Sequence, residues 1–266
     1  MVAIATNTTH RVVSVRLAGR GLAWSNEVVP VLQRDDATIH YDEHGAGFPV
    51  LALAPGGMRS AGSYWEQVPY NPVKELAGDY RVVTMDQRNA GSSTAPVTGG
   101  EGWRTYAEDQ LAVLDHLGIE RCHLVGMCIG GPFILSLLHT APDRFAGAVV
   151  LQSIGLDANR DAFRDMFNTW MTELAPAHSE ADAGAWAAYR SSMYEGEDVL
   201  FSVPDSVLPT ITTPMLVLQG NDQYHPRSAS RLLASSVPGA QFVERWKEQE
   251  HLPAATATIA EFLAAS

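Results

Sequence analysis

A cysteine occupies the position in this sequence best suited to covalent chemistry. The segment Gly126-Met127-Cys128-Ile129-Gly130-Gly131 has the pattern Gly-x-nucleophile-x-Gly, whose central residue lies on a sharp turn between a strand and a helix. An apolar run precedes it at 122–125 and another follows at 133–138, as that strand and helix require. The helix would direct its free N–H groups at the sulfur, so we expect the pKa of the Cys128 thiol to be lowered. Cys128 is therefore the candidate nucleophile.

A thiol nucleophile at such a turn needs a general base and an acid to orient that base. We predict His251 as the base, because it follows the last expected strand and precedes the closing helix. Asp222 follows a predicted core strand and would hold the imidazole, with Asp157 as the reserve candidate. An Asx turn is the alternative interpretation of Asp222, and the role of the nearby His225 is left open.

An acyl-transfer site also needs two N–H donors where negative charge develops on the substrate oxygen. The residue directly after the nucleophile, Ile129, is expected to supply one backbone N–H. The second is expected from Gly57 or Met58, in the small-residue loop after the predicted strand at 50–53. Small residues let a backbone approach a ligand closely.

The elements that must position these residues alternate between strands and helices. Such alternation indicates βαβ units and a mostly parallel sheet. We expect an edge hairpin between 37–42 and 50–53, and a poorly determined extension over residues 1–35 that includes an edge strand at 11–17. The remaining predicted strands are 80–85, 122–125, 146–151, 213–218 and 240–246, and the predicted helices are 106–117, 133–138, 227–236 and 254–265.

The alternation stops between residues 155 and 208, where helical patterns rich in aromatic residues occur. We interpret this segment as a helical lid inserted into a core formed by 36–154 and 209–266. Four residues are candidate contacts for the substrate: Met127, Trp170, Trp186 and Tyr189. For any single lid aromatic, packing between the lid and the sheet is the favoured interpretation. Four arginines are candidates to hold a substrate carboxylate: Arg59, Arg160, Arg164 and Arg190.

The chain resembles the α/β-hydrolase superfamily from about residue 37 onward. The resemblance is carried by five ordered features: Pro55-Gly56-Gly57, 86–93, the turn at 126–131, Gly220-Asn221-Asp222 with Pro226, and His251. It implies an eight-stranded, mostly parallel sheet flanked by helices, with the lid after the sixth strand. Pro55 replaces the family's usual histidine and Asn89 replaces a usual glycine. The cysteine turn itself is similar to those of dienelactone hydrolases and polyhydroxyalkanoate synthases.

A thiolate leaves a tetrahedral intermediate more readily than an alkoxide does, which disfavours amides and plain alkyl esters as substrates. We therefore expect an acyl hydrolase acting on an activated ester, lactone or thioester through an acyl-thioester intermediate. Acyl transfer or C–C bond hydrolysis on the same scaffold is one alternative. A binding protein that kept the pocket without turnover is another, because fold alone does not prove activity.

The composition limits the kinds of binding partner that we expect. The 266 residues carry a formal net charge of −12 with a sequence pI of about 5.1, which argues against nucleic acid and anionic membranes and leaves a small-molecule acyl substrate as the expected partner. Two cysteines on one strand and its turn form no disulfide framework, which predicts a cytoplasmic setting. No metal or cofactor is expected, and the oligomeric state is left open, with a homodimer as one candidate.

Overall fold

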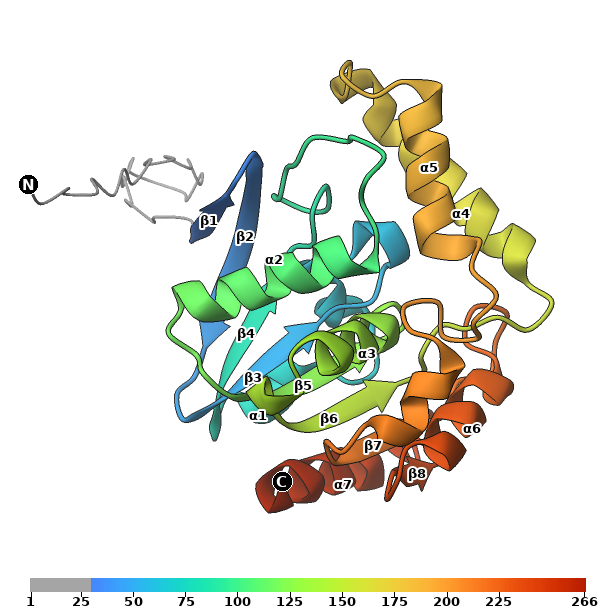
Figure 1. Cartoon of the computed structure of the whole chain (residues 1–266). Helices are drawn as coiled ribbons and strands as arrows, with labels where there is room; N and C mark the ends of the chain where they lie inside the picture. The colour runs from blue at the N-terminus through green and yellow to red at the C-terminus, as the bar shows by residue number, and fades with distance from the viewer. Residues whose placement is uncertain (1–29) are drawn as a thin grey trace, which may run out of the picture.

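The computed structural model describes residues 30–266, which form an eight-stranded sheet flanked by helices. The sheet order is β1-β2-β4-β3-β5-β6-β7-β8 (Figure 1). The pairs β1–β2 and β2–β4 are antiparallel, and all later pairs are parallel. This confirms the predicted fold class. The strands are β1 (Val31–Arg34), β2 (Ala37–His44), β3 (Phe48–Leu53), β4 (Tyr80–Met85), β5 (Cys122–Met127), β6 (Phe145–Leu151), β7 (Met215–Leu218) and β8 (Gln241–Val243).

The α-helices divide between the two faces of the sheet. Side chains of successive strand residues point to opposite faces, so Leu51 and Leu53 pack in one core cluster and Val50 and Ala52 in the other. The first cluster includes residues of α2, α3, α4, α5 and α6, and the second those of α1 and α7. The helices are α1 (Pro72–Leu76), α2 (Trp103–His116), α3 (Gly130–Thr140), α4 (Arg160–Leu174), α5 (Ala183–Tyr194), α6 (Arg227–Ser236) and α7 (Leu252–Ala265).

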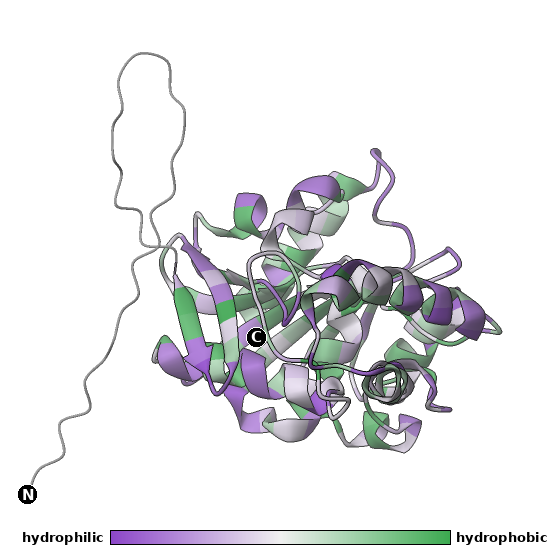
Figure 2. Ribbon diagram, turned by 90° about the horizontal axis from the view of Figure 1, so that it is seen from above, coloured by the Kyte–Doolittle hydropathy of each residue, from purple (hydrophilic) through white to green (hydrophobic). Residues whose placement is uncertain are grey.

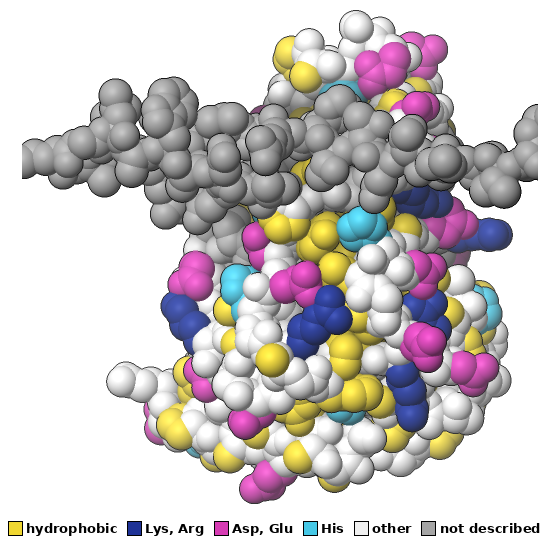
Figure 3. Space-filling model, turned by 90° about the vertical axis from the view of Figure 1, so that its left-hand side faces the viewer, with side chains coloured by type: hydrophobic (Ala, Val, Ile, Leu, Met, Phe, Trp, Pro, Cys, Tyr) yellow, Lys and Arg dark blue, Asp and Glu magenta, His cyan; other side chains and the backbone are white. Residues whose placement is uncertain are grey.

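Hydropathy follows this layering. Figure 2 shows apolar residues concentrated on the central strands and hydrophilic residues on the outer surfaces of the helices. The face shown in Figure 3 carries acidic and basic side chains interspersed, without a broad patch of one sign. Among residues 30–266, no helix is long and apolar enough to cross a membrane.

The first strands differ from the sequence-based expectations. The edge hairpin does not form: β2 pairs with β4, and β3 lies on the other side of β4, next to β5. The last four residues of β3 are buried, so the strand is stabilised by parallel neighbours on both sides rather than at an edge. Residues 31–34, which we expected to belong to an undetermined extension, form β1, and the predicted strand at 11–17 lies outside the described residues.

The segment from 155 to 208 contains α4, α5, the short 3-10 turn η4 (Ala175–Ala177) and the first part of η5 (Asp205–Thr210). We call it the α4–α5 segment. It projects beyond the carboxyl ends of the central strands (Figure 1). Helix α4 contacts η1 (Gly57–Arg59), the turn that follows β3. The α4–α5 segment therefore lies against the loop expected to contribute N–H donors.

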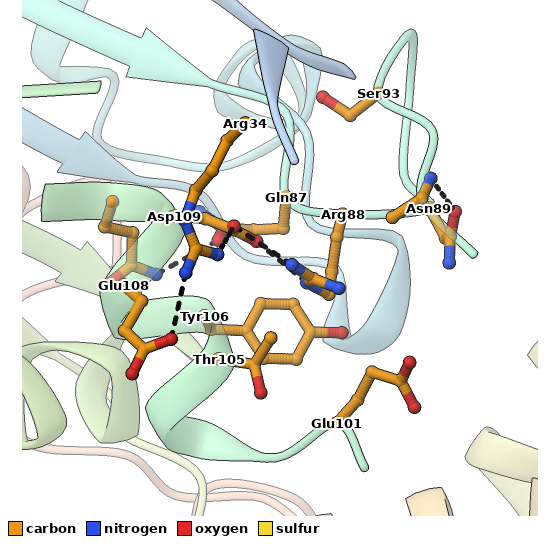
Figure 4. Close-up of polar contacts among 12 residues, drawn as sticks. Arg34, Gln87, Arg88, Asn89, Ser93, Glu101, Thr105, Tyr106, Glu108 and Asp109 are labelled. Atoms are coloured by element: carbon orange, nitrogen blue, oxygen red, sulfur yellow. Dashed lines mark hydrogen bonds and ion pairs between the residues drawn. The ribbon is translucent and has the colours of Figure 1, made fainter. Parts of the chain in front are cut away.

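A buried charge cluster ties β1, the loop after β4 and α2 together (Figure 4). The carboxylate of Asp109 accepts hydrogen bonds from Arg88 Nε at 2.8 Å, Arg88 Nη2 at 3.0 Å and Arg34 Nη1 at 2.6 Å. Asp109 is fully buried and Arg88 nearly so. In the same loop, Asp86 accepts the backbone N–H groups of Gly62 and Ser92. The contacts of Arg88 with Asp109 thereby fix the loop after β4 to α2.

Replacing Asp109 with asparagine should lower the free energy of unfolding by about 3–5 kcal/mol, because two guanidinium groups would lose their buried counter-charge. Urea denaturation would measure the change. The matched control is Arg104→Ala, which removes an exposed ion pair on the same helix and should cost less than about 1 kcal/mol. Equal effects of the two substitutions would contradict the prediction.

Candidate active site

The turn at Cys128 has the strained geometry that the sequence predicts. Cys128 adopts a φ of 61°, in the left-handed region, between β5 and α3. Its glycine neighbours leave room for this turn. A Cβ on Gly126 would lie 2.6 Å from the carbonyl oxygen of Gly130, and a Cβ on Gly130 would lie 2.5 Å from that of Leu53. The turn therefore holds the sulfur at the carboxyl end of β5, next to β3, where the strand order changes direction.

His225, and not His251, is the imidazole that faces Cys128. Its ring lies beside the sulfur, and its Nδ1 is 2.7 Å from Oδ1 of Asp222. With Nδ1 paired to the carboxylate, Nε2 is the nitrogen left for the sulfur; it makes no other hydrogen bond among residues 30–266. Its contact with sulfur is looser than a well-aligned hydrogen bond, as is common at catalytic sites without substrate. Cys128, His225 and Asp222 thus form one continuous chain of contacts.

His251 has a different environment. It immediately precedes α7, and its Nε2 lies 3.7 Å from Oε1 of Glu250. It does not line the cavity beside Cys128. The reason lies in the path of 244–250, where the buried Trp246 donates its ring N–H to the carbonyl of Gln219 and fixes the loop. Sequence position alone cannot specify that path. The structure therefore corrects our prediction that His251 is the base beside Cys128.

Asp222 lies where the sequence predicts it, and it also makes the Asx turn that we weighed as an alternative. Its Oδ1 accepts the backbone N–H groups of Tyr224 and His225, each at 3.1 Å, as well as contacting the His225 ring. Lys247 approaches the other oxygen at 3.7 Å. The reserve acid Asp157 instead accepts a hydrogen bond from Ser228. An aspartate and a histidine three residues apart in a turn were the signal available for His225.

The three groups perturb one another's proton affinities. The hydrogen bond from His225 lowers the pKa of Asp222 to about 2. Burial alone would lower the pKa of His225, but Asp222 and Cys128 outweigh it and raise that pKa to about 9. Burial would likewise raise the pKa of Cys128, yet His225 and two backbone N–H groups lower it. These directions favour a thiolate beside an imidazolium.

The two backbone N–H groups that face the sulfur belong to Ile129 and Gly56. Ile129 is the residue predicted for this place. The loop donor is Gly56, one residue before the predicted Gly57. Gly56 adopts a φ of 119° in the turn after β3. Gly57 lines the cavity, whereas Met58 is buried and its sulfur accepts a hydrogen bond from the Tyr194 hydroxyl. Small residues in the loop permit this close approach of the backbone.

A cavity of about 240 Å³ opens beside Cys128 and His225. Apart from the two glycines, Cys128 and His225, its lining is apolar and aromatic: Ile154, Phe163, Met166, Tyr194 and Tyr224. The four residues predicted to bind substrate lie elsewhere. Met127 is buried in the sheet core, and the others pack inside the α4–α5 segment: Trp170, Trp186 and Tyr189. The periodic pattern indicated their burial but not which residues face the cavity.

Residues 49–209 match the protein family described as "alpha/beta hydrolase fold", which covers more than half of the chain. The chain belongs to this family. Among curated relatives, a protein named putative carbamate hydrolase RutD from Stutzerimonas stutzeri is 28% identical over 233 residues, 76% of this chain and 86% of that protein. A 2-hydroxy-6-oxo-6-phenylhexa-2,4-dienoate hydrolase from Burkholderia cepacia is 25% identical over 262 residues, 85% and 91% of the two chains.

Solved structures of the hydrolase fold agree with this assignment. An enol-lactonase from Burkholderia xenovorans superposes with a TM-score of 0.67 at 20% identity, covering 88% of this chain and 100% of its own. Est816, described as an N-acyl homoserine lactone degrading enzyme, gives 0.64 at 23% identity, with 89% and 99% covered. At these identities the likeness concerns the fold. Together with the curated relatives, the family match supports a hydrolase.

Proposed function

We propose that this protein is an acyl hydrolase that attacks an activated ester, lactone or thioester with Cys128, uses His225 as acid and base, and uses Asp222 to orient His225. The contact chain from Cys128 through His225 to Asp222 carries the proposal. It joins a nucleophile, a histidine and a carboxylate at the edge of one cavity, with two backbone N–H groups beside the sulfur. The named activities of the curated relatives, both hydrolases, favour the same reaction class.

In the first half-reaction the thiolate of Cys128 attacks the carbonyl carbon and forms a C–S bond. The carbonyl oxygen gains negative charge, which the N–H groups of Ile129 and Gly56 are placed to stabilise. The C–O or C–S bond of the leaving group then breaks, and the imidazolium of His225 gives its proton to the leaving group. An acyl-thioester on Cys128 and a neutral His225 result.

In the second half-reaction His225 takes a proton from water as that water attacks the thioester. Acylation has removed the thiolate charge, which is one cause of the raised His225 pKa. The pKa of His225 is therefore lower in the acyl-enzyme, so the imidazole is more readily neutral at neutral pH and able to accept this proton. The C–S bond breaks, the acid is released, and the thiolate–imidazolium pair returns. Asp222 keeps Nδ1 protonated throughout and so leaves Nε2 for the chemistry.

Transfer of the acyl group to a second acceptor is the alternative that uses the same intermediate. Incubation of the enzyme with p-nitrophenyl acetate in the presence of added alcohols or amines separates the two outcomes. Free acetate as the main product supports the hydrolase, and a dominant acetylated acceptor would identify a transferase. A ligand-binding protein without turnover would release no p-nitrophenol beyond background.

The pH dependence of kcat/KM tests the role of Asp222. We expect activity to fall at alkaline pH with a midpoint near 9, because the imidazolium that protonates the leaving group is lost there. Asp222 raises the pKa of His225, so Asp222→Asn should move this midpoint to lower pH by about one unit or more. Because p-nitrophenolate leaves without a proton, the substrate for this test is S-ethyl thioacetate, whose ethanethiolate leaving group needs one. Steady-state release of acetate from it between pH 5 and 10 measures the shift. An unchanged alkaline midpoint would exclude Asp222 as the partner of His225.

A further inference from the structure

The cavity beside Cys128 offers no counter-charge to an anionic substrate. Among residues 30–266, no lysine or arginine lines it, and its wall is built mainly from apolar and aromatic side chains. Among the cavity residues only the side chain of His225 can carry a positive charge, and Asp222 and the Cys128 thiolate beside it offset that charge. A carboxylate placed here would be desolvated next to a thiolate without a partner, which is strongly unfavourable.

The arginines considered as carboxylate holders are all engaged with other groups. Arg59 pairs with Glu173 at 2.6 Å, and Arg164 with Glu195 and Asp161. Arg160 donates to the carbonyl oxygen of Tyr194, and Arg190 to the side chain of Asn168. None of the four lines the cavity. Recruiting one of them would break an existing contact, so the site favours a neutral acyl group.

Met166 limits the cavity on the side of the glycine loop. Its sulfur lies against Gly57, only 2.4 Å from the position that a Cβ on Gly57 would occupy. Met166 both lines the cavity and is partly exposed, so its side chain reaches from the cavity to the surface where α4 contacts η1. The cavity volume of about 240 Å³ is below the ~300–1,000 Å³ usual for drug-sized ligands. Shortening Met166 would open this end.

We propose that the site selects short, uncharged acyl groups and that Met166 sets their maximum length. The inference rests on the proposed acyl hydrolase and adds to it the class of substrate. It separates this chain from a hydrolase for dienoates, the carboxylate substrates in the printed name of the relative from Burkholderia cepacia. Neutral esters with small acyl groups fit the lining, and acyl groups that end in a carboxylate do not.

Two pairs of substrates and three variants test the inference. Mono-p-nitrophenyl glutarate and p-nitrophenyl pentanoate differ by a terminal carboxylate in place of a methyl group; we expect kcat/KM to be about 100-fold higher for the pentanoate. We also expect wild type to prefer p-nitrophenyl butyrate to decanoate. Met166→Ala should raise the decanoate-to-butyrate ratio about tenfold or more, and Met166→Leu should keep the wild-type ratio. Met171→Ala, on the same helix but outside the cavity, is the matched control and should also keep it.

The outcomes distinguish the inference from the function on which it rests. Turnover that depends on Cys128, together with equal use of glutarate and pentanoate or an unchanged chain-length ratio in Met166→Ala, would overturn the inference and leave the hydrolase standing. Failure of every ester to acylate Cys128 would overturn the hydrolase and the inference with it. Circular dichroism and thermal unfolding of Met166→Ala establish that the variant is folded, and Met166→Leu and Met171→Ala show whether any change is specific to the length of the side chain at 166.

Discussion

Replacing Cys128 with alanine is expected to reduce kcat/KM for p-nitrophenyl acetate by about 10³-fold or more, because the variant lacks the atom that forms the acyl-enzyme. Backbone N–H groups and the cavity would remain and could still bind the ester. Release of p-nitrophenol measures the loss, and intact-mass spectrometry of the wild type after brief acid quench should reveal one added acetyl group. The same adduct should be absent from Cys128→Ala.

Cys122, the first residue of the strand that leads to Cys128, provides a matched control. It is buried, and burial raises the pKa of its thiol to about 12, so it should neither acylate nor react with iodoacetamide at neutral pH. Cys122→Ala is expected to retain the acetyl adduct and turnover within about threefold of wild type, after correction for the folded fraction. Undiminished turnover in Cys128→Ala, or an adduct that disappears in Cys122→Ala, would contradict the assignment of the nucleophile.

The parts of the site that the sequence predicts well are those determined by local geometry. The turn at Cys128 follows from glycines spaced around one residue between an apolar strand and an apolar helix, and the structure shows the same close approaches that require those glycines. Asp222 is also a local feature, since it follows β7 and closes its own turn. The alternation of strands and helices predicts the mostly parallel sheet, and the resemblance to the α/β-hydrolase superfamily implies its eight strands.

The features that sequence analysis missed depend on tertiary paths. The placement of His251 depends on seven loop residues whose course is fixed by Trp246 and Lys247, through contacts with residues far away in the sequence. The cavity lining depends on which faces of α4 and α5 are turned toward the glycine loop. Phe163 and Tyr194 line the cavity, whereas Trp170 and Trp186 pack against each other. The exchange of β3 and β4 in the sheet likewise requires a long-range pairing that alternation of apolar residues does not specify.

Substitution of each of the two histidines should have very different effects on activity. His225→Gln should lower kcat/KM for p-nitrophenyl acetate by about 10²–10⁴-fold, because it removes the group that donates and accepts the proton. His251→Gln should retain activity within about threefold, because this side chain lies outside the cavity and contacts Glu250. Glutamine is uncharged and similar in reach to histidine, so both substitutions test proton transfer with limited loss of packing.

Alkylation of Cys128 separates proton transfer from a simple structural effect. In wild type and His251→Gln, iodoacetamide should modify Cys128 at a pH well below the ordinary thiol pKa of about 8.5, because His225 lowers the pKa of the sulfur. In His225→Gln the alkylation midpoint should move upward toward that ordinary value, with the far-ultraviolet circular dichroism unchanged. If instead His251→Gln moves the midpoint and abolishes turnover, the loop containing His251 must approach Cys128 during the reaction, and the contact between His225 and the sulfur would be a resting arrangement.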